Sequence, residues 1–256
     1  MVRLSDYPLL LFVICFVILT CAAFAGRRWT SRRKELLDEA SETFGVVQAA
    51  SLTLLALLIG FTFSMAISRY DQRKTYEEEE ANAIGTEMAR LDLIDDKAQP
   101  LAKALLAKYL QQRIAFYQAP NETEASRVLV IQAGIETQLW KSVVDAGRER
   151  RDPITGLAVA GMNDVLNASG YTQAAWWNRI PRSAWLLLLV LGTFANLLVG
   201  MGAKNARKAP SLLVIMPFFA AMSFAFIADI DAPRGGLIRV VPQNLIAVMD
   251  SLKPAP

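Results

Sequence analysis

The chain has 256 residues, 54% of them apolar, and a formal net charge of only +3. The absence of histidine excludes Ser-His-Asp and Cys-His catalysis, histidine pH switches and zinc sites that need imidazole. A charge of +3 is too small to argue for a nucleic-acid partner. Cys15 and Cys21 lie six residues apart on one predicted helix, too far along its axis for a disulfide within the chain.

The charged residues are unevenly distributed, and four segments contain no Asp, Glu, Lys or Arg. Each is about 20 residues or longer, which as a helix crosses the ~30 Å hydrocarbon core of a bilayer. We therefore predict an all-α membrane protein with four transmembrane helices. They occupy residues 7–26, 43–68, 183–203 and 209–228.

The segment 69–182, between the second and third spans, has a different composition. It contains 15 basic and 16 acidic residues, and prolines divide it into pieces of helical length. We predict a helical extramembrane domain here, entered by a helix that continues the second span. Asn121 and Glu124 form a capping-box-like helix start, and Pro153 opens a helix predicted to end near Gly170.

In the first piece of the 69–182 domain, Leu101, Leu105, Tyr109 and Phe116 share one helical face, which predicts core packing.

Residues 229–256 follow the fourth span, and we predict that they form a C-terminal tail.

Loop charge predicts the orientation. The loop after the first span carries five basic residues and the loop between the last two spans carries three: Arg27, Arg28, Arg32, Arg33 and Lys34, then Lys204, Arg207 and Lys208. The positive-inside rule places both loops in the cytoplasm, and both termini and the 69–182 domain outside it. Ala23-Phe24-Ala25 resembles a signal-peptidase site, but the basic residues directly after it oppose export, so we expect the first span to be retained.

The second span carries polar residues at helical spacing. Thr53, Gly60, Ser64 and Ser68 cluster on one side, as expected either for close helix packing or for a wetted path. Where the span ends, a single face carries Thr62, Ala66, Arg69 and Arg73.

Four consecutive carboxylates, residues 77–80, follow these bases. One interpretation is a solvated helix with i,i+4 pairs such as Arg73 with Glu77, and another is a cluster that neutralises the bases or favours cations. A divalent-metal site that uses Glu79, Glu80, Asp229 or Asp231 is a weaker alternative, because no loop of recognised ligand spacing accompanies them. We predict no metal site, no cofactor and no catalytic residue, since no P-loop, nucleophile elbow or dinucleotide fingerprint occurs.

Three blocks of this sequence resemble the bacterial bestrophin-like family, and more distantly the bestrophin anion channels. They are Gly60-Phe61-Thr62-Phe63-Ser64 through Arg69-Tyr70, then Glu80-Ala81-Asn82-Ala83-Ile84-Gly85-Thr86, and Asp229-Ile230-Asp231 with Pro233. The resemblance implies a multi-pass protein of the bacterial inner membrane with the predicted four-span plan. It also implies a homo-oligomer, suspected to be a pentamer, that passes small ions.

By this resemblance the second span is the candidate pore helix. The constriction falls on Gly60, Phe61, Thr62, Phe63 and Ser64, and the pore mouth on Arg69, Tyr70, Arg73 and Lys74. The remaining family-motif positions are Glu80, Asn82, Gly85, Thr86, Asp229, Asp231 and Pro233. Apolar Phe61 or Phe63 would form a constriction that loses water, with bases at its mouth that attract anions.

We therefore expect an ion channel, not an enzyme, with the lipid bilayer and small ions as partners. The alternative is a membrane-anchored sensor or scaffold whose helical domain binds a partner or ligand. Bestrophins hold the domain between their second and third spans in the cytoplasm, which conflicts with the loop charges. We favour the charges, because five basic residues in one short loop are hard to translocate.

Overall fold

The computed structural model describes residues 4–32, 41–94, 97–203 and 211–253, and all regular structure within these ranges is helical. The chain divides into two compact units. The membrane unit comprises Met1–Ser68 and Arg179–Ile238, and the helical unit comprises Arg69–Asn178 and Arg239–Pro256. The predicted all-α fold class is confirmed.

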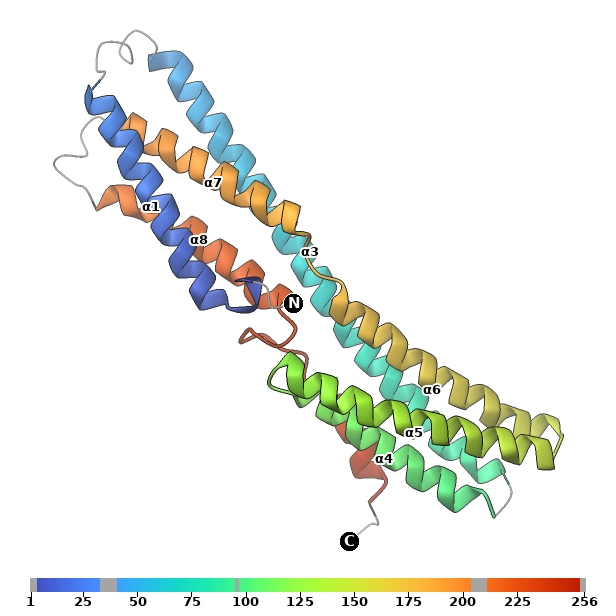
Figure 1. Ribbon diagram of the computed structural model, residues 1–256. Coiled ribbons are helices and arrows are strands. Elements are labelled where there is room, and N and C mark those ends of the chain that lie inside the picture. The colour runs from blue at the N-terminus through green and yellow to red at the C-terminus, as the bar shows by residue number, and fades with distance from the viewer. Residues whose placement is uncertain (1–3, 33–40, 95–96, 204–210, 254–256) are drawn as a thin grey trace. The chain divides into compact units, whose positions relative to one another are not determined.

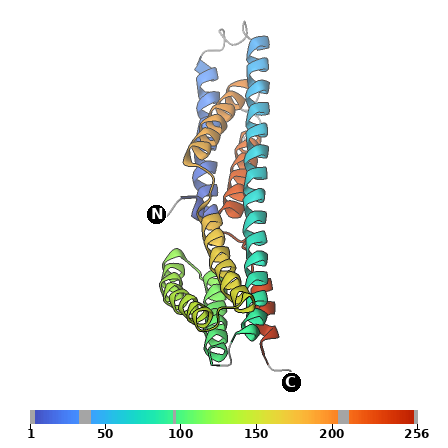
Figure 2. The same ribbon diagram turned by 90° about the vertical axis from the view of Figure 1, so that its right-hand side faces the viewer.

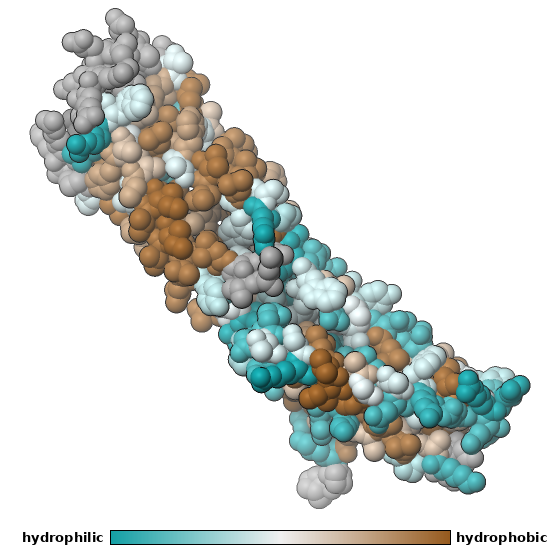
Figure 3. Space-filling model, in the orientation of Figure 1, coloured by the Kyte–Doolittle hydropathy of each residue, from teal (hydrophilic) through white to brown (hydrophobic). Residues whose placement is uncertain are grey.

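The membrane unit contains α1 (Pro8–Arg32), the first part of α3 (Ser41–Arg90), α7 (Arg182–Gly202) and α8 (Leu212–Asp231). Its surface in Figure 3 is dominated by hydrophobic residues. Four helical segments are long and apolar enough to cross a membrane: Pro8–Thr30, Thr43–Leu93, Pro153–Gly202 and Leu212–Asp231. The prediction of four spans is therefore confirmed.

Glycines allow α1 and α7 to pack backbone to backbone, as Figure 1 shows for these neighbouring helices. A Cβ at Gly200 would collide with the Ala23 carbonyl, and a Cβ at Gly26 would collide with the Leu197 carbonyl. Small residues serve this purpose in membranes, where close packing rather than apolar burial holds helices together. Thr30 adds a hydrogen bond from its Oγ1 to the Met201 carbonyl at 2.9 Å.

Asn196, which lies on the same small-residue face of α7, is fully buried. Its Nδ2 donates to the Gly192 carbonyl of its own helix at 2.8 Å. The i−4 carbonyl lies within reach of a helical side chain and satisfies the donor locally.

The helical unit contains the second part of α3, η2 (Leu91–Leu93), α4 (Gln99–Gln118), α5 (Glu122–Glu149), α6 (Pro153–Trp177) and α9 (Gln243–Ser251). Its core includes fully buried Leu106, Tyr109, Leu139 and Met162. Figure 2 shows α9 beside α3, and the methyl groups of Val248 in α9 lie 3.6–3.9 Å from where a Gly85 side chain would begin.

Helices α5 and α6 begin where the sequence predicts, and each has a side-chain cap at its N-terminus. The Asn121 side chain accepts from the Glu124 N–H at 2.9 Å, and Asp152 accepts from the Thr155 N–H at 2.7 Å. Each satisfies a backbone donor that the first helical turn leaves without a partner.

Two predictions about the helical unit were wrong in detail. The helix that opens at Pro153 continues through Gly170 to Trp177, because one glycine inside a helix weakens it without ending it. Leu101 is exposed rather than part of the core face of α4, which lies on residues 102, 106, 109, 110, 113, 116 and 117.

Most of the basic residues that predict orientation lie outside the described residues, namely Arg33, Lys34, Lys204, Arg207 and Lys208. Within the described part, α1 ends at Arg32 and α7 ends at Gly202. Arg27, Arg28 and Arg32 belong to the C-terminal part of α1, and the other five basic residues follow α1 or α7 in the sequence.

We expect Gly200→Ala to lower the thermal stability of the detergent-purified protein by about 1–3 kcal/mol, because the new methyl group meets the Ala23 backbone. Gly45→Ala is the matched control, since no atom of the described part of the chain lies within 4 Å of its Cβ position. Thermal unfolding compares the two variants. A Gly200→Ala protein as stable as the control would contradict the close backbone contact.

Candidate functional site

Helix α3 carries most of the predicted site residues, and its two faces have opposite environments. The buried face carries residues spaced mostly three, four or seven apart: Leu55, Thr62, Ala66, Arg73, Glu77, Glu80, Ile84 and Glu87. At 3.6 residues per turn these positions share one side of the helix.

The opposite side of the membrane half is uncovered in the described chain. It carries the set that we call the open stripe: Thr53, Leu57, Gly60, Ser64 and Ser68, all exposed. Of the residues that the structure describes, none lies within 4 Å of the position that a Gly60 side chain would take. The sequence grouped four of these residues on one side, and the structure shows that this side faces away from the rest of its own unit.

The predicted constriction residues divide between the faces. Phe61 is 68% exposed and Phe63 is 39% exposed, and by helical register they flank the open stripe on its two sides. Thr62 is buried, and its hydroxyl donates to the Leu58 carbonyl at 2.7 Å. Gly60 and Ser64 lie on the open stripe itself.

The predicted mouth residues divide in the same way. Lys74 is exposed, Arg69 and Tyr70 are half-buried, and Arg73 is only 1% exposed. The face that the sequence defined by Thr62, Ala66 and Arg73 is therefore the one that packs inside its own units.

A buried ion pair lies at the centre of the helical unit. Glu80 of α3 binds Arg113 of α4 in a bidentate manner, with Arg113 Nε on one carboxylate oxygen and Nη2 on the other at 3.0 Å. Both side chains have no exposed surface. Breaking such a pair leaves an uncompensated buried charge, which costs about 3–5 kcal/mol.

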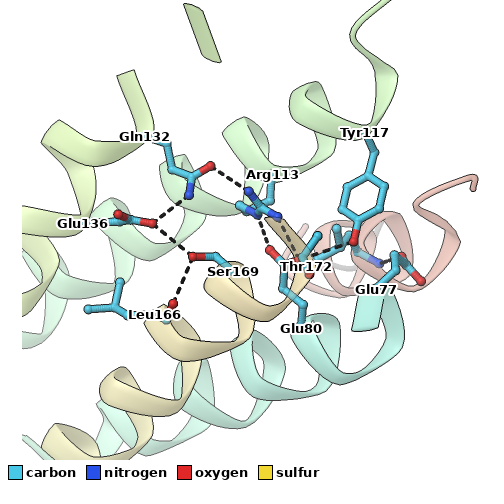
Figure 4. Close-up of polar contacts among 10 residues, drawn as sticks. Glu77, Glu80, Arg113, Tyr117, Gln132, Glu136, Leu166, Ser169 and Thr172 are labelled. Atoms are coloured by element: carbon cyan, nitrogen blue, oxygen red, sulfur yellow. Dashed lines mark hydrogen bonds and ion pairs between the residues drawn. The ribbon is translucent and has the colours of Figure 1, made fainter. Parts of the chain in front are cut away.

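Polar side chains from three further positions complete this cluster (Figure 4). Thr172 of α6 donates to Glu80 Oε2 at 2.9 Å, Tyr117 donates to the same oxygen at 3.5 Å, and Gln132 of α5 accepts from Arg113 Nη1 at 2.8 Å. Gln132 continues to Glu136 at 2.7 Å. The cluster therefore joins α3, α4, α5 and α6.

Burial and the neighbouring charges shift the pKa values of two residues in this cluster, Arg113 and Tyr117. Burial on its own would lower the pKa of Arg113, but the adjacent Glu80 carboxylate raises it above its usual value. Burial and the same carboxylate raise the pKa of Tyr117. Arg113 also lies 4.8 Å from the centre of the Phe116 ring, which is within cation–π distance. Arg113 therefore stays charged, and its buried pair with Glu80 links α3 to α4.

Glu77 joins the C-terminal helix to α3. Its carboxylate accepts from the backbone N–H groups of Asn244 and Leu245, both at 3.0 Å, and from Asn244 Nδ2 at 2.7 Å. An anion at a helix N-terminus satisfies free donors and is favoured by the helix dipole. Glu77 and Glu80 are buried, whereas Glu78 and Glu79 are exposed, so the interpretation of this run as a uniformly solvated face is wrong.

The remaining motif carboxylates organise one end of the membrane unit. Asp229 accepts from the backbone N–H groups of Leu237 and Ile238 at 2.7 and 3.0 Å. Asp231 accepts from the Ile180 N–H at 3.1 Å. A Cβ at Gly236 would collide with Asp229, which explains a glycine in this turn. Pro233 is buried in the same turn.

These carboxylates use their oxygens on protein donors. Within the described ranges, no three or more His, Cys, Asp or Glu side chains gather where they could hold a metal ion. Of the other motif positions, Asn82 and Thr86 are exposed on the helical part of α3, and Gly85 is half-buried.

Sequence reasoning did not single out the partners of Glu80. The available signal was Arg113 itself, a charged residue on the otherwise apolar face of α4 between Tyr109 and Phe116. A charge on a core face implies a buried counter-charge, but which carboxylate supplies it depends on how the helices pack.

Glu87 is a second buried acid that the sequence did not single out. It has no exposed surface, and its carboxylate oxygens find no hydrogen-bond partner among the described residues. It lies against Gly161 of α6, where a side chain would collide with it. Burial raises its pKa to about 8, partly offset by the Arg90 cation and reinforced by Asp164.

This predicts a pH dependence of stability. Between pH 4.5 and about 8 the unfolded chain has released the Glu87 proton and the folded chain has kept it, so stability falls as pH rises through this window and levels off above it. Glu87→Gln removes this fall. Melting temperatures from pH 5 to 9 measure it, with exposed Glu79→Gln as the control, and equal pH slopes for wild type and Glu87→Gln would refute the prediction.

The fold and site define a helical multi-pass membrane protein in which a 50-residue helix, α3, contributes to both units. The family model described as the Bestrophin-like domain matches residues 14–245, and the chain therefore belongs to the bestrophin-like family. Membership supports an ion-channel kind of function. No curated protein matches the chain.

Solved structures share the fold at low sequence identity. A crystal structure of a bacterial bestrophin homologue from Klebsiella pneumoniae, carrying a point mutation, is 12% identical, with a TM-score of 0.65, and covers 93% of this chain and 99% of its own. Another variant of that homologue is 13% identical, with a TM-score of 0.63 and coverage of 94% and 97%.

Proposed function

We propose that this protein is an oligomeric ion channel of the inner membrane in which the membrane half of α3 lines the pore. Family membership supports a channel. The observation that carries the pore assignment is the open stripe, in which all residues but Leu57 are small or carry a hydroxyl group, and which lies uncovered on a membrane helix whose opposite face is buried.

The composition of the stripe favours contact with water or with another copy over contact with lipid. Glycine destabilises a helix interior by about 1 kcal/mol relative to alanine, and no close neighbour among the described residues requires a glycine at position 60. The Thr53 hydroxyl donates to the Ala49 carbonyl at 2.9 Å, so Thr53 can face a narrow pore without an unsatisfied donor. Several copies of α3 around one axis, with five suspected, would place these stripes toward a shared path.

Phe61 is our candidate for the constriction, with Phe63 on the other flank of the stripe. A ring of phenylalanine side chains closes a narrow pore by excluding water. Phe61 has the larger exposed fraction, 68% against 39%, so its ring is the more available to a shared axis. Thr62 supports the helix from the buried face.

The charges beyond the membrane half bear on ion choice. By helical register Asp71 and Glu78 continue the line of the open stripe, and both are exposed, whereas Arg73 is buried. Lys74 is the exposed base nearest to this line. The resemblance to bestrophin anion channels favours anions, but the acidic residues on the open side favour cations, and we propose small cations as the preferred ions.

We expect Phe61→Ala to raise ion flux through proteoliposomes several-fold, because it widens the constriction. Phe226→Ala is the matched control, since Phe226 is 54% exposed on α8. Stopped-flow assays with Na⁺ and with Cl⁻ measure the flux and its selectivity. The channel proposal fails if neither ion moves through wild type or Phe61→Ala.

We also propose that both termini and the helical unit lie outside the cytoplasm, as the loop charges predict. In a Cys15→Ala, Cys21→Ala background, Asn163→Cys should react with an impermeant maleimide on intact spheroplasts, because residue 163 is exposed on α6. Arg28→Cys, exposed at the end of α1, should react only after permeabilisation. The reverse pattern would place the domain in the cytoplasm.

A second candidate function is a sensor or scaffold whose helical unit binds a partner. It is favoured by exposed apolar side chains on α5, where Val130 is 76% exposed and Ile131 is 53% exposed. Native mass spectrometry in mild detergent separates the two functions, since a ring of about five copies supports the channel and a monomer supports the sensor.

A further inference from the structure

The helical unit has an open groove of about 530 Å³ between α5 and α6, near the turn that joins these two antiparallel helices (Figure 1). This size lies within the ~300–1,000 Å³ of pockets that hold small ligands. The apolar part of the lining comes from Val144, Gly147, Gly156, Val159 and Ala160. No residue of α3 lines the groove, so it is separate from the proposed pore helix.

Two glycines leave room for this groove. A Cβ at Gly147 would lie 3.2 Å from a methyl carbon of Val159, so α5 and α6 approach each other closely there. Gly156 is different, because it is exposed and no described atom lies within 4 Å of its Cβ position. Packing against the described residues therefore does not require a glycine at position 156. Since Gly156 lines the groove, a larger side chain there would occupy part of it.

An aromatic ring lines the end of the groove that lies away from the turn. Trp140 is 40% exposed, and it precedes Gly147 by seven residues, about 10 Å along α5. Asn163 of α6 lies at the same end, because the two helices run in opposite directions from the turn at residues 150–152. The indole ring offers a flat surface on which an aromatic or aliphatic group can pack.

An ion pair lines the end of the groove at the turn. Arg150 Nε pairs with Asp152, and Asp152 also caps α6 by accepting from the Thr155 N–H at 2.7 Å. That backbone hydrogen bond lowers the pKa of Asp152, so its carboxylate keeps its charge at neutral pH. The Arg150 N–H donates to the Ala146 carbonyl at 3.0 Å, at the end of α5. The ends of both helices therefore hold the pair in place.

Both members of the pair can still bind a ligand. The pair uses only Nε of Arg150, and its two Nη groups have no other partner within the described ranges. Each oxygen of Asp152 accepts one hydrogen bond and keeps a further lone pair. The two side chains are 56% and 27% exposed. This end of the groove thus offers donors for a carboxylate and acceptors for an ammonium group, at zero net charge.

We propose that this groove binds a free α-amino acid with an apolar side chain, and that an aromatic side chain fits best. The α-carboxylate accepts from the Nη groups of Arg150, and the α-ammonium donates to Asp152. The side chain lies along Val159 toward Trp140. A monocarboxylate or an amine would contact only one member of the ion pair. The inference goes beyond the channel proposal and does not depend on it, because it needs only the helical unit.

The test uses the full-length protein in mild detergent, with L-phenylalanine as the probe and saturation-transfer difference NMR as the measurement. Gly156→Leu fills the groove. Gly134→Leu is the matched control, since Gly134 is an exposed glycine of α5 outside the groove, and no described atom lies within 4 Å of its Cβ position either. We expect affinity to fall about tenfold in Gly156→Leu and to stay unchanged in Gly134→Leu.

Side-chain variants test the two ends of the groove separately. Arg150→Gln should weaken the binding of L-phenylalanine, whereas Arg148→Gln should not. Arg148 is exposed, pairs with Asp145 at 3.7 Å and does not line the groove. Trp140→Leu should weaken L-phenylalanine more than L-leucine, because it removes the ring and keeps an apolar surface.

Two analogues test the class of ligand. 3-Phenylpropionate lacks the ammonium group and 2-phenylethylamine lacks the carboxylate, so each should bind about tenfold more weakly than L-phenylalanine. An analogue that binds as tightly as L-phenylalanine would overturn the assignment of a zwitterion.

The site itself is overturned by either of two results. One is wild-type protein that gives no signal with L-phenylalanine at about 5 mM. The other is equal binding by the Gly156→Leu and Gly134→Leu proteins, which would mean that the detergent or another surface holds the probe. Ion flux enters none of these measurements, so a failure here is distinct from a failure of the channel proposal.

Discussion

The burial of charge along one face of α3 is the constraint on which the helical unit depends. Glu80 has no exposed surface, and its ion pair with Arg113, together with the surrounding hydrogen-bond donors, replaces the hydration that its carboxylate loses on burial. The ion pair therefore fixes the rotation of α3 about its own axis relative to α4. A rotation of 100°, which corresponds to one residue, would move the Glu80 carboxylate away from Arg113. Glu77, one turn earlier, imposes the same rotation through α9.

The motif residues of the family fall into two groups, those that bind donors inside the fold and those that lie on the uncovered side of α3. Glu80, Asp229 and Asp231 bind backbone or buried side-chain donors, so they maintain the fold around the proposed pore helix. Gly60 and Ser64, by contrast, lie on the uncovered side of the membrane half of α3 in the described part of the chain. The sequence resemblance does not separate these two groups. The packing shows that the carboxylates stabilise the fold, which leaves Gly60 and Ser64 as the candidates for contact with ions.

Several parts of the fold were predictable because they depend on local chemistry. Four charge-free segments of bilayer length predicted the spans. The cap at Asn121 and the proline at position 153 predicted where α5 and α6 begin. The end of α6 was not predictable in this way, since Gly170 weakens the helix while packing of Thr172 and Trp176 sustains it. The interpretation of residues 77–80 failed for a related reason, because consecutive carboxylates look equivalent until the packing shows which of them are buried.

The sequence by itself determined the class of this protein: a helical four-span membrane protein without histidine chemistry, because hydropathy and residue absence are properties of the chain alone. Its resemblance blocks pointed to the family that the family model then showed. Only the tertiary structure decided that Arg73 is turned inward and that Arg113 is the partner of Glu80. Helical periodicity says which residues share a side, but which side is covered depends on contacts with helices distant in the sequence.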